Sequence, residues 1–197
     1  MDYFIFMSDS EKFKNKYRIK SSRLEGWDYS SSGVYFVTIC TKNREHHFGE
    51  IKDEKMYLSE MGGIISEEWI NTKNIRKNVQ LDEWVIMPNH IHGIIFITEK
   101  DVETHCNASL HCNVSLSGNL KYKNKFGPQL DNLSSIIRGF KGIITKQIHK
   151  LGYDYFAWQS RFHDRIIRNE EELNRIREYI ISNPKNWEKD ENNIIKK

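Results

Sequence analysis

The chain has 197 residues, of which 38% are hydrophobic, and its formal net charge is +3 at pH 7. This length predicts one domain with a sizeable core, which needs no disulfide or metal to fold. The three cysteines do not make a disulfide framework, and the longest apolar runs are too short to span a bilayer. Free thiols and the lack of a signal peptide predict a cytoplasmic protein with no membrane partner.

Residues 1–25 are expected to form a basic N-terminal arm. The stretch 11–23 carries six Lys and Arg side chains against the single acidic residue Glu11. Such a run suits a polyanionic partner. Charge alone favours a solvated, partly disordered arm at least as strongly.

β-Branched and aromatic residues between turn residues predict several strands in the first half of the chain. Ser59 is expected to cap a helix that reaches about residue 76. Pro88 cannot donate to a β-ladder, so a turn between two strands is expected there. The predicted strands are 34–40, 48–51, 55–58, 81–87 and 91–97.

Residues 99–129 are polar and are expected to form a loop inserted at the surface. Within it, 105–110 (HCNASL) and 111–116 (HCNVSL) are tandem hexamers that differ at one position. Their period is too short for a solenoid, so we interpret them as a duplication. A zinc site remains the alternative, although the ligand spacing is unusual for a zinc knuckle; its ligands would be His105, Cys106, His111 and Cys112.

The second half of the chain predicts a helix, a strand and another helix, followed by a charged tail that is frayed from residue 188 to 197. Residues 26–187 are therefore expected to form one domain. The mixture of elements predicts an α+β sandwich, with helices on one face of an antiparallel sheet. The predicted elements are a helix at 132–151 capped by Asp131 and stopped by Gly152, a strand at 161–168, and a helix at 170–182 ended by Asn183-Pro184.

His90 and His92 flank Ile91 at the start of a predicted strand. Residues two apart in a strand point to the same face, so both imidazoles project together while Ile91 enters the core. Two neutral imidazoles side by side can serve as metal ligands, although a complete site needs a third group. Taken alone, such a pair more often just ends a strand.

Tyr179 and Asn183 form a second candidate cluster. Their spacing of four residues places both side chains on one face of the predicted helix. A phenol there could attack phosphorus, while the amide oxygen of Asn183 could complete a metal shell. A core tyrosine followed by an asparagine cap is the more common fate of such residues.

Three segments, WVIMPNHIHGIIF, FAWQSRFHDRIIR and REYIISNPKNW, resemble in this order the REP-associated tyrosine transposases, which are IS200-like enzymes of the HUH superfamily. The segment RLEGWDYSSSGVYFVTICTKNREHHFGEI is similar to the same group. The similarity spans roughly residues 17–187 and is poor in the loop at 99–129. It implies a ferredoxin-like or RRM-like α+β sandwich of the HUH nuclease type.

The resemblance also implies a mechanism. His90 and His92 match the paired metal ligands, Tyr179 matches the nucleophile, and Asn183 matches the third ligand, for which IS200-type enzymes carry the longer Gln. A divalent cation, Mg²⁺ or Mn²⁺, would polarise the scissile phosphate. Tyr179 would form a 5′-phosphotyrosine link that a 3′-hydroxyl can reverse. The implied activity is cleavage and rejoining of single-stranded DNA hairpins, by a monomer rather than a dimer.

Basic and aromatic residues supply candidate DNA contacts. Trp27, Tyr29 and Trp158 could stack on unpaired bases, with core packing as the alternative for Trp158. His163 is expected to be structural. The predicted phosphate contacts are Arg18, Lys20 and Arg23 in the arm, and Lys141 and Lys146 on a helix face that could equally be only solvated.

Two other functions fit the same residues. A non-catalytic module could bind nucleic-acid hairpins, with His90 and His92 in structural roles. A metal-dependent phosphodiesterase could instead use an activated water, and it would cut DNA without a covalent intermediate.

Overall fold

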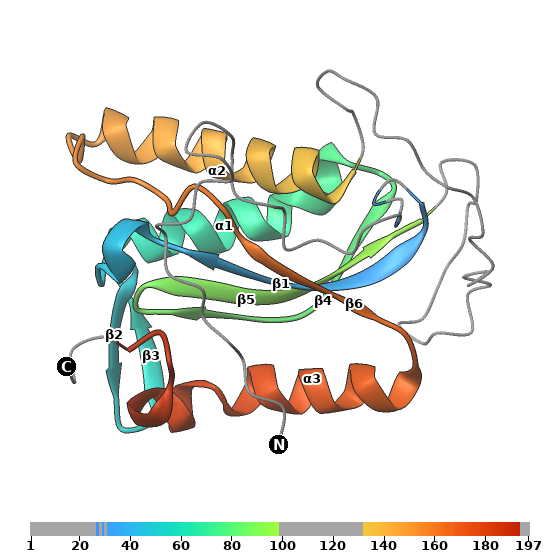
Figure 1. Ribbon diagram of the computed structural model, residues 1–197. Coiled ribbons are helices and arrows are strands. Elements are labelled where there is room, and N and C mark those ends of the chain that lie inside the picture. The colour runs from blue at the N-terminus through green and yellow to red at the C-terminus, as the bar shows by residue number, and fades with distance from the viewer. Residues whose placement is uncertain (1–26, 28, 30, 99–131, 194–197) are drawn as a thin grey trace, which may run out of the picture.

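The computed structural model describes residues 27, 29, 31–98 and 132–193. They form a four-stranded antiparallel sheet with helices on both faces, and a separate two-stranded hairpin (Figure 1). The predicted arm, with Arg18, Lys20 and Arg23, and the duplicated hexamers lie outside the described residues.

The strand order of the sheet is β4–β5–β1–β6, and every neighbouring pair is antiparallel. With its two crossing helices, the chain runs β1–α1–β4–β5–α2–β6, which is the ferredoxin-like arrangement. The predicted α+β sandwich is therefore confirmed. The elements are β1 (Gly33–Cys40), α1 (Glu60–Ile75), β4 (Val79–Met87), β5 (His90–Ile97), α2 (Leu133–Lys150) and β6 (His163–Ile167).

A hairpin of β2 (Gly49–Lys52) and β3 (Lys55–Leu58) follows the short 3₁₀ helix η1 (Lys42–Arg44) and leads into α1. Its two turn residues, Asp53 and Glu54, have φ values of 48° and 60°, as a two-residue hairpin turn requires. The hydroxyl of Ser59 then accepts the amide N–H of Gly62 at 3.1 Å and begins α1, as predicted.

The start of α2 differs by one residue from the prediction. Asn132, rather than Asp131, is the N-cap, and its side-chain oxygen accepts the amide N–H of Ser135 at 2.9 Å. The amide N–H of Asn132 donates in return to the hydroxyl of Ser135 at 3.1 Å. This reciprocal pair is a capping box, which satisfies two backbone N–H groups at the start of the helix.

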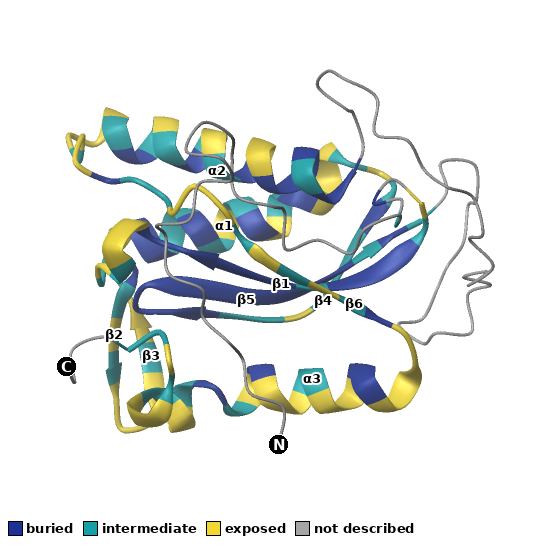
Figure 2. Ribbon diagram, viewed as in Figure 1, coloured by how far each residue is buried: buried dark blue, intermediate teal, exposed yellow. Residues whose placement is uncertain are grey.

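Burial shows two apolar layers, one on each side of the sheet (Figure 2). The layer under α1 and α2 contains alternate residues of β1 and β5 together with helix side chains, including Tyr35, Val37, Ile39, Ile91, Trp69 and Phe140. The other layer lies under α3 (Glu170–Ser182) and contains Val34, Ile94, Ile167, Leu173 and Ile180.

The expectation that the helices share one face of the sheet is therefore wrong. α3 covers the face opposite to α1 and α2 (Figure 1). The reason is that this face also carries apolar residues, such as Val34 and Ile94, which are stabilised by burial under a helix. Leu173 and Ile180, two turns apart on α3, supply it.

The predicted frayed tail is also wrong for residues 188–193. After α3, the chain enters the 3₁₀ helix η2 (Pro184–Lys189), and the ring of Trp187 lies 6.1 Å from that of His90. The carbonyl of Asn192 then accepts a hydrogen bond from Nδ2 of Asn89 at 2.8 Å. The ring of Trp187 and the buried amide of Asn89 hold this segment against the start of β5.

No helix within the described ranges is long and apolar enough to cross a membrane.

Candidate active site

His90 and His92 lie at the start of β5, on the face of the sheet that α3 covers. Both imidazoles are buried, and Ile91 between them packs into the core on the opposite face, as predicted from the alternation of a strand. The two Nε2 atoms are 3.0 Å apart. The pair therefore presents one nitrogen from each ring to the same point.

Asn89 determines which nitrogen of His90 carries the proton. Its Nδ2 donates to the carbonyls of Arg44 and Asn192 at 2.9 and 2.8 Å, so its Oδ1 faces His90. This oxygen lies 2.8 Å from Nδ1 of His90. An amide oxygen can only accept, so Nδ1 donates and Nε2 keeps its lone pair toward His92.

His92 is held in the same way from its other side. Its Nδ1 lies 2.9 Å from the hydroxyl oxygen of Thr38, and its Nε2 lies 3.2 Å from the hydroxyl of Tyr179. In the tautomer of His92 whose Nδ1 donates to the hydroxyl of Thr38, the phenol donates to Nε2, and two acceptor nitrogens face each other at 3.0 Å. Two such lone pairs repel unless they share a cation, so the geometry fits a metal site.

The charge states of the two histidines agree with this role. Burial, together with the imidazole of His92, holds the pKa of His90 well below its ordinary value. Burial, with a smaller contribution from His163, lowers the pKa of His92 to about 3. Both rings are therefore neutral at pH 7, which is the form that binds metals.

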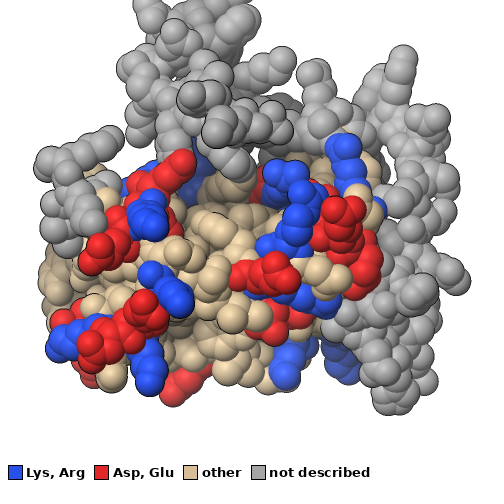
Figure 3. All heavy atoms as spheres, turned by 90° about the horizontal axis from the view of Figure 1, so that it is seen from below, with Lys and Arg blue, Asp and Glu red and all other residues tan. Residues whose placement is uncertain are grey.

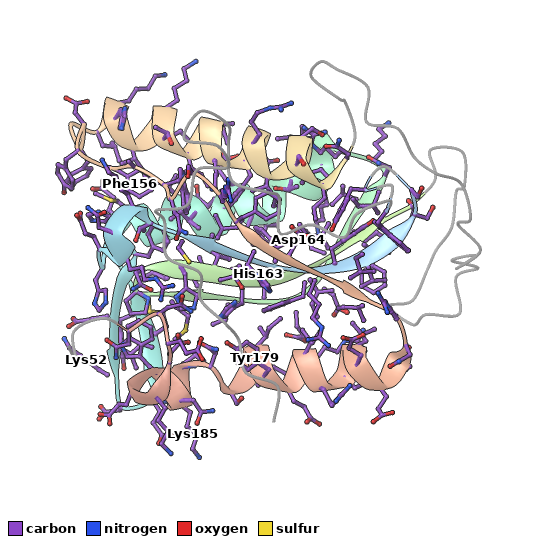
Figure 4. All side chains as sticks on the ribbon, in the orientation of Figure 1. Lys52, Phe156, His163, Asp164, Tyr179 and Lys185 are labelled. Atoms are coloured by element: carbon purple, nitrogen blue, oxygen red, sulfur yellow. The ribbon has the colours of Figure 1, made fainter. Side chains whose placement is uncertain are left out.

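Tyr179 rises from α3 toward the sheet (Figure 4) and is half-exposed. Its ring meets that of Phe36 edge-on, with the centroids 6.1 Å apart. Burial and the negative charges of Asp190 and Glu191 raise the pKa of Tyr179 to about 12, and a hydrogen bond from Asn183 partly opposes the rise. The phenol is therefore protonated at neutral pH.

Asn183 caps the C-terminal end of α3, one turn after Tyr179. It is buried, and the two side chains hydrogen-bond as their common helix face predicts. Its Oδ1 is buried and has no hydrogen-bond partner among the residues that the structure describes. A buried amide oxygen without a partner is costly, and a metal ligand role would satisfy it.

Asp190 is a candidate ligand that sequence reasoning missed. Its Oδ2 lies 3.9 Å from Nε2 of His90, and the ligand atoms of His90, His92 and Asp190 all lie within 4.8 Å of one another. Two imidazoles with a carboxylate and an amide oxygen suit a divalent cation such as Mn²⁺ or Mg²⁺. No sequence signal pointed to Asp190, because we expected the charged tail to be frayed from residue 188 onward.

An open cleft of about 740 Å³ contains the site and extends beyond it. β1 and β6 form its floor, α3 forms one wall, and residues 189–192 close one end. Thr38, His92, Tyr179, Asn183 and Asp190 all line it. The cleft is thus large enough to admit part of a polymeric substrate, with the candidate nucleophile on its wall.

The two predicted helix contacts, Lys141 and Lys146, lie on α2, on the other side of the sheet from Tyr179. The ammonium of Lys141 donates to the carbonyls of Gln159 and Arg161 at 2.7 and 3.3 Å. Lys146 is exposed to solvent. A DNA contact by either lysine remains a prediction, and the site itself is assembled without them.

The candidate stacking residues are placed in the core rather than at the cleft. Tyr29 is buried, and Trp158 packs on Phe156 with a centroid separation of 5.2 Å. Trp27 is half-buried and donates to the hydroxyl of Tyr35 at 3.1 Å. His163, which we expected to be structural, is exposed and lines the cleft.

Comparison with known proteins places the chain in a family. No family model matches it. An uncharacterized protein of Haemophilus influenzae is 38% identical over 172 residues, which cover 87% of this chain and 91% of the relative. The chain belongs to the family of that protein.

The fold of this family also occurs in a solved structure of a REP-associated tyrosine transposase bound to a REP hairpin. The two structures share 21% sequence identity and a TM-score of 0.52, over 86% of this chain and 73% of the other. The predicted relationship is therefore confirmed at the level of the fold. Within this fold, His90, His92 and Tyr179 meet on one face of the sheet.

Proposed function

We propose that the protein is a metal-dependent tyrosine transposase, which cleaves and rejoins single-stranded DNA hairpins. The observation that carries this proposal is the 3.2 Å separation between the hydroxyl of Tyr179 and Nε2 of His92. The phenol of Tyr179, which is the nucleophile in this proposal, thus lies beside two neutral imidazoles in an open cleft. The REP hairpin bound to the structural neighbour supports a hairpin as the DNA partner.

In the proposed cleavage step, the oxygen of Tyr179 attacks the scissile phosphorus in line with the leaving oxygen. The bond from phosphorus to the 3′-oxygen breaks, and that oxygen leaves as a 3′-hydroxyl after gaining a proton. The phenol loses its own proton, so the protons balance. The product is a 5′-phosphotyrosine at Tyr179, with the cut 3′ end still free.

The raised pKa of Tyr179, about 12, means that the phenol needs help to lose its proton. His92 is the nearest acceptor, but with a pKa of about 3 it is a weak base. A divalent cation held by His90, His92 and Asn183, with Asp190 in reach, would polarise the phosphate and favour the phenolate through its charge. Asn183 also donates to the phenol and holds it over the site.

Rejoining is the reverse reaction with a different 3′ end. A 3′-hydroxyl attacks the phosphorus of the phosphotyrosine, the bond to Tyr179 breaks, and the phenol recovers its proton. Because the phosphotyrosine keeps the energy of the phosphodiester, joining needs no nucleotide cofactor.

We also propose that the protein acts as a monomer. Tyr179 lies 3.2 Å from His92 of the same chain, which supports a site whose proposed nucleophile and ligands come from one copy. A mixture of Tyr179→Phe and His92→Ala proteins is therefore expected to stay inactive. Recovery of cleavage in the mixture would show that two chains share the site.

The proposal is tested by incubating hairpin DNA, labelled at its 5′ and 3′ ends in separate samples, with the protein and Mn²⁺ or Mg²⁺. We expect the label on the 3′ fragment to migrate with the protein on a denaturing gel. Cleavage without a protein-linked fragment would favour a hydrolytic phosphodiesterase instead. Binding with no cleavage, equal in EDTA and after His90→Ala, would favour a non-catalytic module.

A further inference from the structure

The cleft continues past the histidines along β6, and the strand register places Arg165 at its far part. Thr38 of β1 pairs with His92 on one side and with His163 on the other. The next residue on the same face of β1 is Phe36, which pairs with Arg165. Two strand spacings and one side-chain repeat put Arg165 about 12 Å from His92, measured between Cα atoms.

Glu172 of α3 holds Arg165 in one orientation. Nε of Arg165 donates to Oε1 of Glu172 at 2.7 Å, while Oε2 accepts the amide N–H of Arg168 at 3.0 Å. Glu172 is only 8% exposed, so its carboxylate is fixed by α3 and by the turn before it. The guanidinium of Arg165 is thus oriented by a hydrogen bond from one nitrogen, Nε.

The two terminal nitrogens of the Arg165 guanidinium are accessible to a ligand in the cleft. Neither terminal nitrogen of its guanidinium has a hydrogen-bond partner within the described part of the chain, and the side chain is 54% exposed. Arg161 and Arg175 line the same cleft, and Phe36 and Ile176 add apolar surface to it. A planar fork with two free N–H groups, oriented in advance, matches the oxygens of a phosphate.

The surface around the cleft favours a local contact over general attraction. On the face seen from below, Lys and Arg side chains of the described residues alternate with Asp and Glu (Figure 3). This mixed surface favours individual phosphate contacts by arginines of the cleft.

We propose that Arg165, positioned by Glu172, binds a backbone phosphate of the DNA strand in the cleft, next to the phosphate that Tyr179 attacks. This proposal rests on the proposed function, because it takes single-stranded DNA as the substrate. Arg165 holds the strand in register, and Glu172 acts only through Arg165. The contact is independent of base identity, since it reaches the phosphate and not a base edge.

The test compares Arg165→Gln with Arg168→Gln, an exposed arginine that does not line the cleft. Binding of fluorescein-labelled oligothymidylate is measured by fluorescence anisotropy over a series of salt concentrations, in EDTA so that no cleavage occurs. We expect Arg165→Gln to weaken binding roughly five- to tenfold and to reduce the salt slope by about 0.7. Arg168→Gln is expected to bind as the wild type does.

An abasic strand of the same length distinguishes a phosphate contact from a base contact. We expect the same loss of affinity for it in Arg165→Gln, partial recovery in Arg165→Lys, and an intermediate loss in Glu172→Gln. A loss confined to the strand with bases, or equal affinities of Arg165→Gln and Arg168→Gln, would overturn the proposal. Because this measurement needs no cleavage, failure to trap a covalent adduct would refute the proposed function without changing this result.

Discussion

The hydroxyl of Tyr179 lies 3.2 Å from Nε2 of His92, and the same nitrogen lies 3.0 Å from Nε2 of His90. When His92 carries its proton on Nδ1, a single lone pair on Nε2 faces both the phenol and the point where a cation would bind. The hydrogen bond from the phenol and a metal compete for this lone pair. Metal binding is thus expected to release Tyr179 from His92, which couples the ligand pair to the nucleophile.

Asn183→Ala tests the third ligand. It removes an amide oxygen that has no partner within the described ranges, so we expect Mn²⁺ binding to weaken by about ten- to a hundredfold. Isothermal titration of the purified protein measures this affinity directly. Asp190→Asn is the matched comparison, because it keeps an oxygen but removes the charge. Wild-type affinity in Asn183→Ala together with a large loss in Asp190→Asn would make Asp190 the third ligand instead.

Asn89 offers a second prediction, because its Nδ2 and Oδ1 have different partners: Nδ2 donates to two backbone carbonyls, and Oδ1 accepts from His90. Asn89→Asp keeps an acceptor for Nδ1 of His90 but loses the donors to the carbonyls of Arg44 and Asn192. Asn89→Ala loses both. We expect Asn89→Ala to weaken Mn²⁺ binding about ten- to a hundredfold and to change the protonated nitrogen of His90.

Nitrogen-15 NMR of the imidazoles in the metal-free protein reports that proton. Wild type and Asn89→Asp should both show His90 protonated at Nδ1, whereas Asn89→Ala should show a mixture. A wild-type spectrum with the proton at Nε2 would contradict the orientation of Asn89 on which the site depends.

Acid should destabilise the metal-free protein through the two buried histidines. The pKa of His92 falls from 6.5 to about 3 on folding, and that of His90 also falls. Between these values the unfolded chain binds protons that the folded chain does not. Stability is therefore full above pH 6.5 and declines toward pH 3, by at most about 1.4 kcal/mol per pH unit for each histidine.

Urea unfolding in EDTA at a series of pH values below 6.5 measures this decline. His92→Gln removes one of the two groups, so its stability should fall less steeply with acid. Carboxylates such as Glu172, whose pKa is lowered, add the same loss to both proteins and cancel in the comparison. Parallel curves for wild type and His92→Gln would be inconsistent with a neutral, buried His92.

The sequence predicted the parts of the fold that depend on local pattern. β-Branched and aromatic residues along 34–40 and 91–97 predicted β1 and β5, and the two-residue repeat of a strand predicted the common face of His90 and His92. The sequence of α3 alone could not predict which side of the sheet it covers. That side depends on the face on which Val34 and Ile94 lie after the strands pair. Periodicity describes one element at a time, whereas layer placement needs the sheet.

In the site, too, local spacing predicted some features, whereas others depend on contacts between distant segments. The spacing of Tyr179 and Asn183 predicted their common helix face, and the structure brings the phenol to His92. Asp190 was missed because its position depends on long-range contacts, above all the hydrogen bond between Asn192 and Asn89. A carboxylate in a charged segment carries no local signal of burial. In the structure, the ring of Trp187 lies 6.1 Å from that of His90, directly before this segment.

The most direct test of the central claim is to locate the covalent bond. Hairpin DNA is incubated with the wild type and Mn²⁺, the adduct is digested with nuclease and protease, and the modified peptide is identified by mass spectrometry. We predict a nucleotide attached to Tyr179, and no adduct in Tyr179→Phe, which should still bind the hairpin as tightly as the wild type. An adduct at another residue, or one formed by Tyr179→Phe at the wild-type rate, would contradict the account.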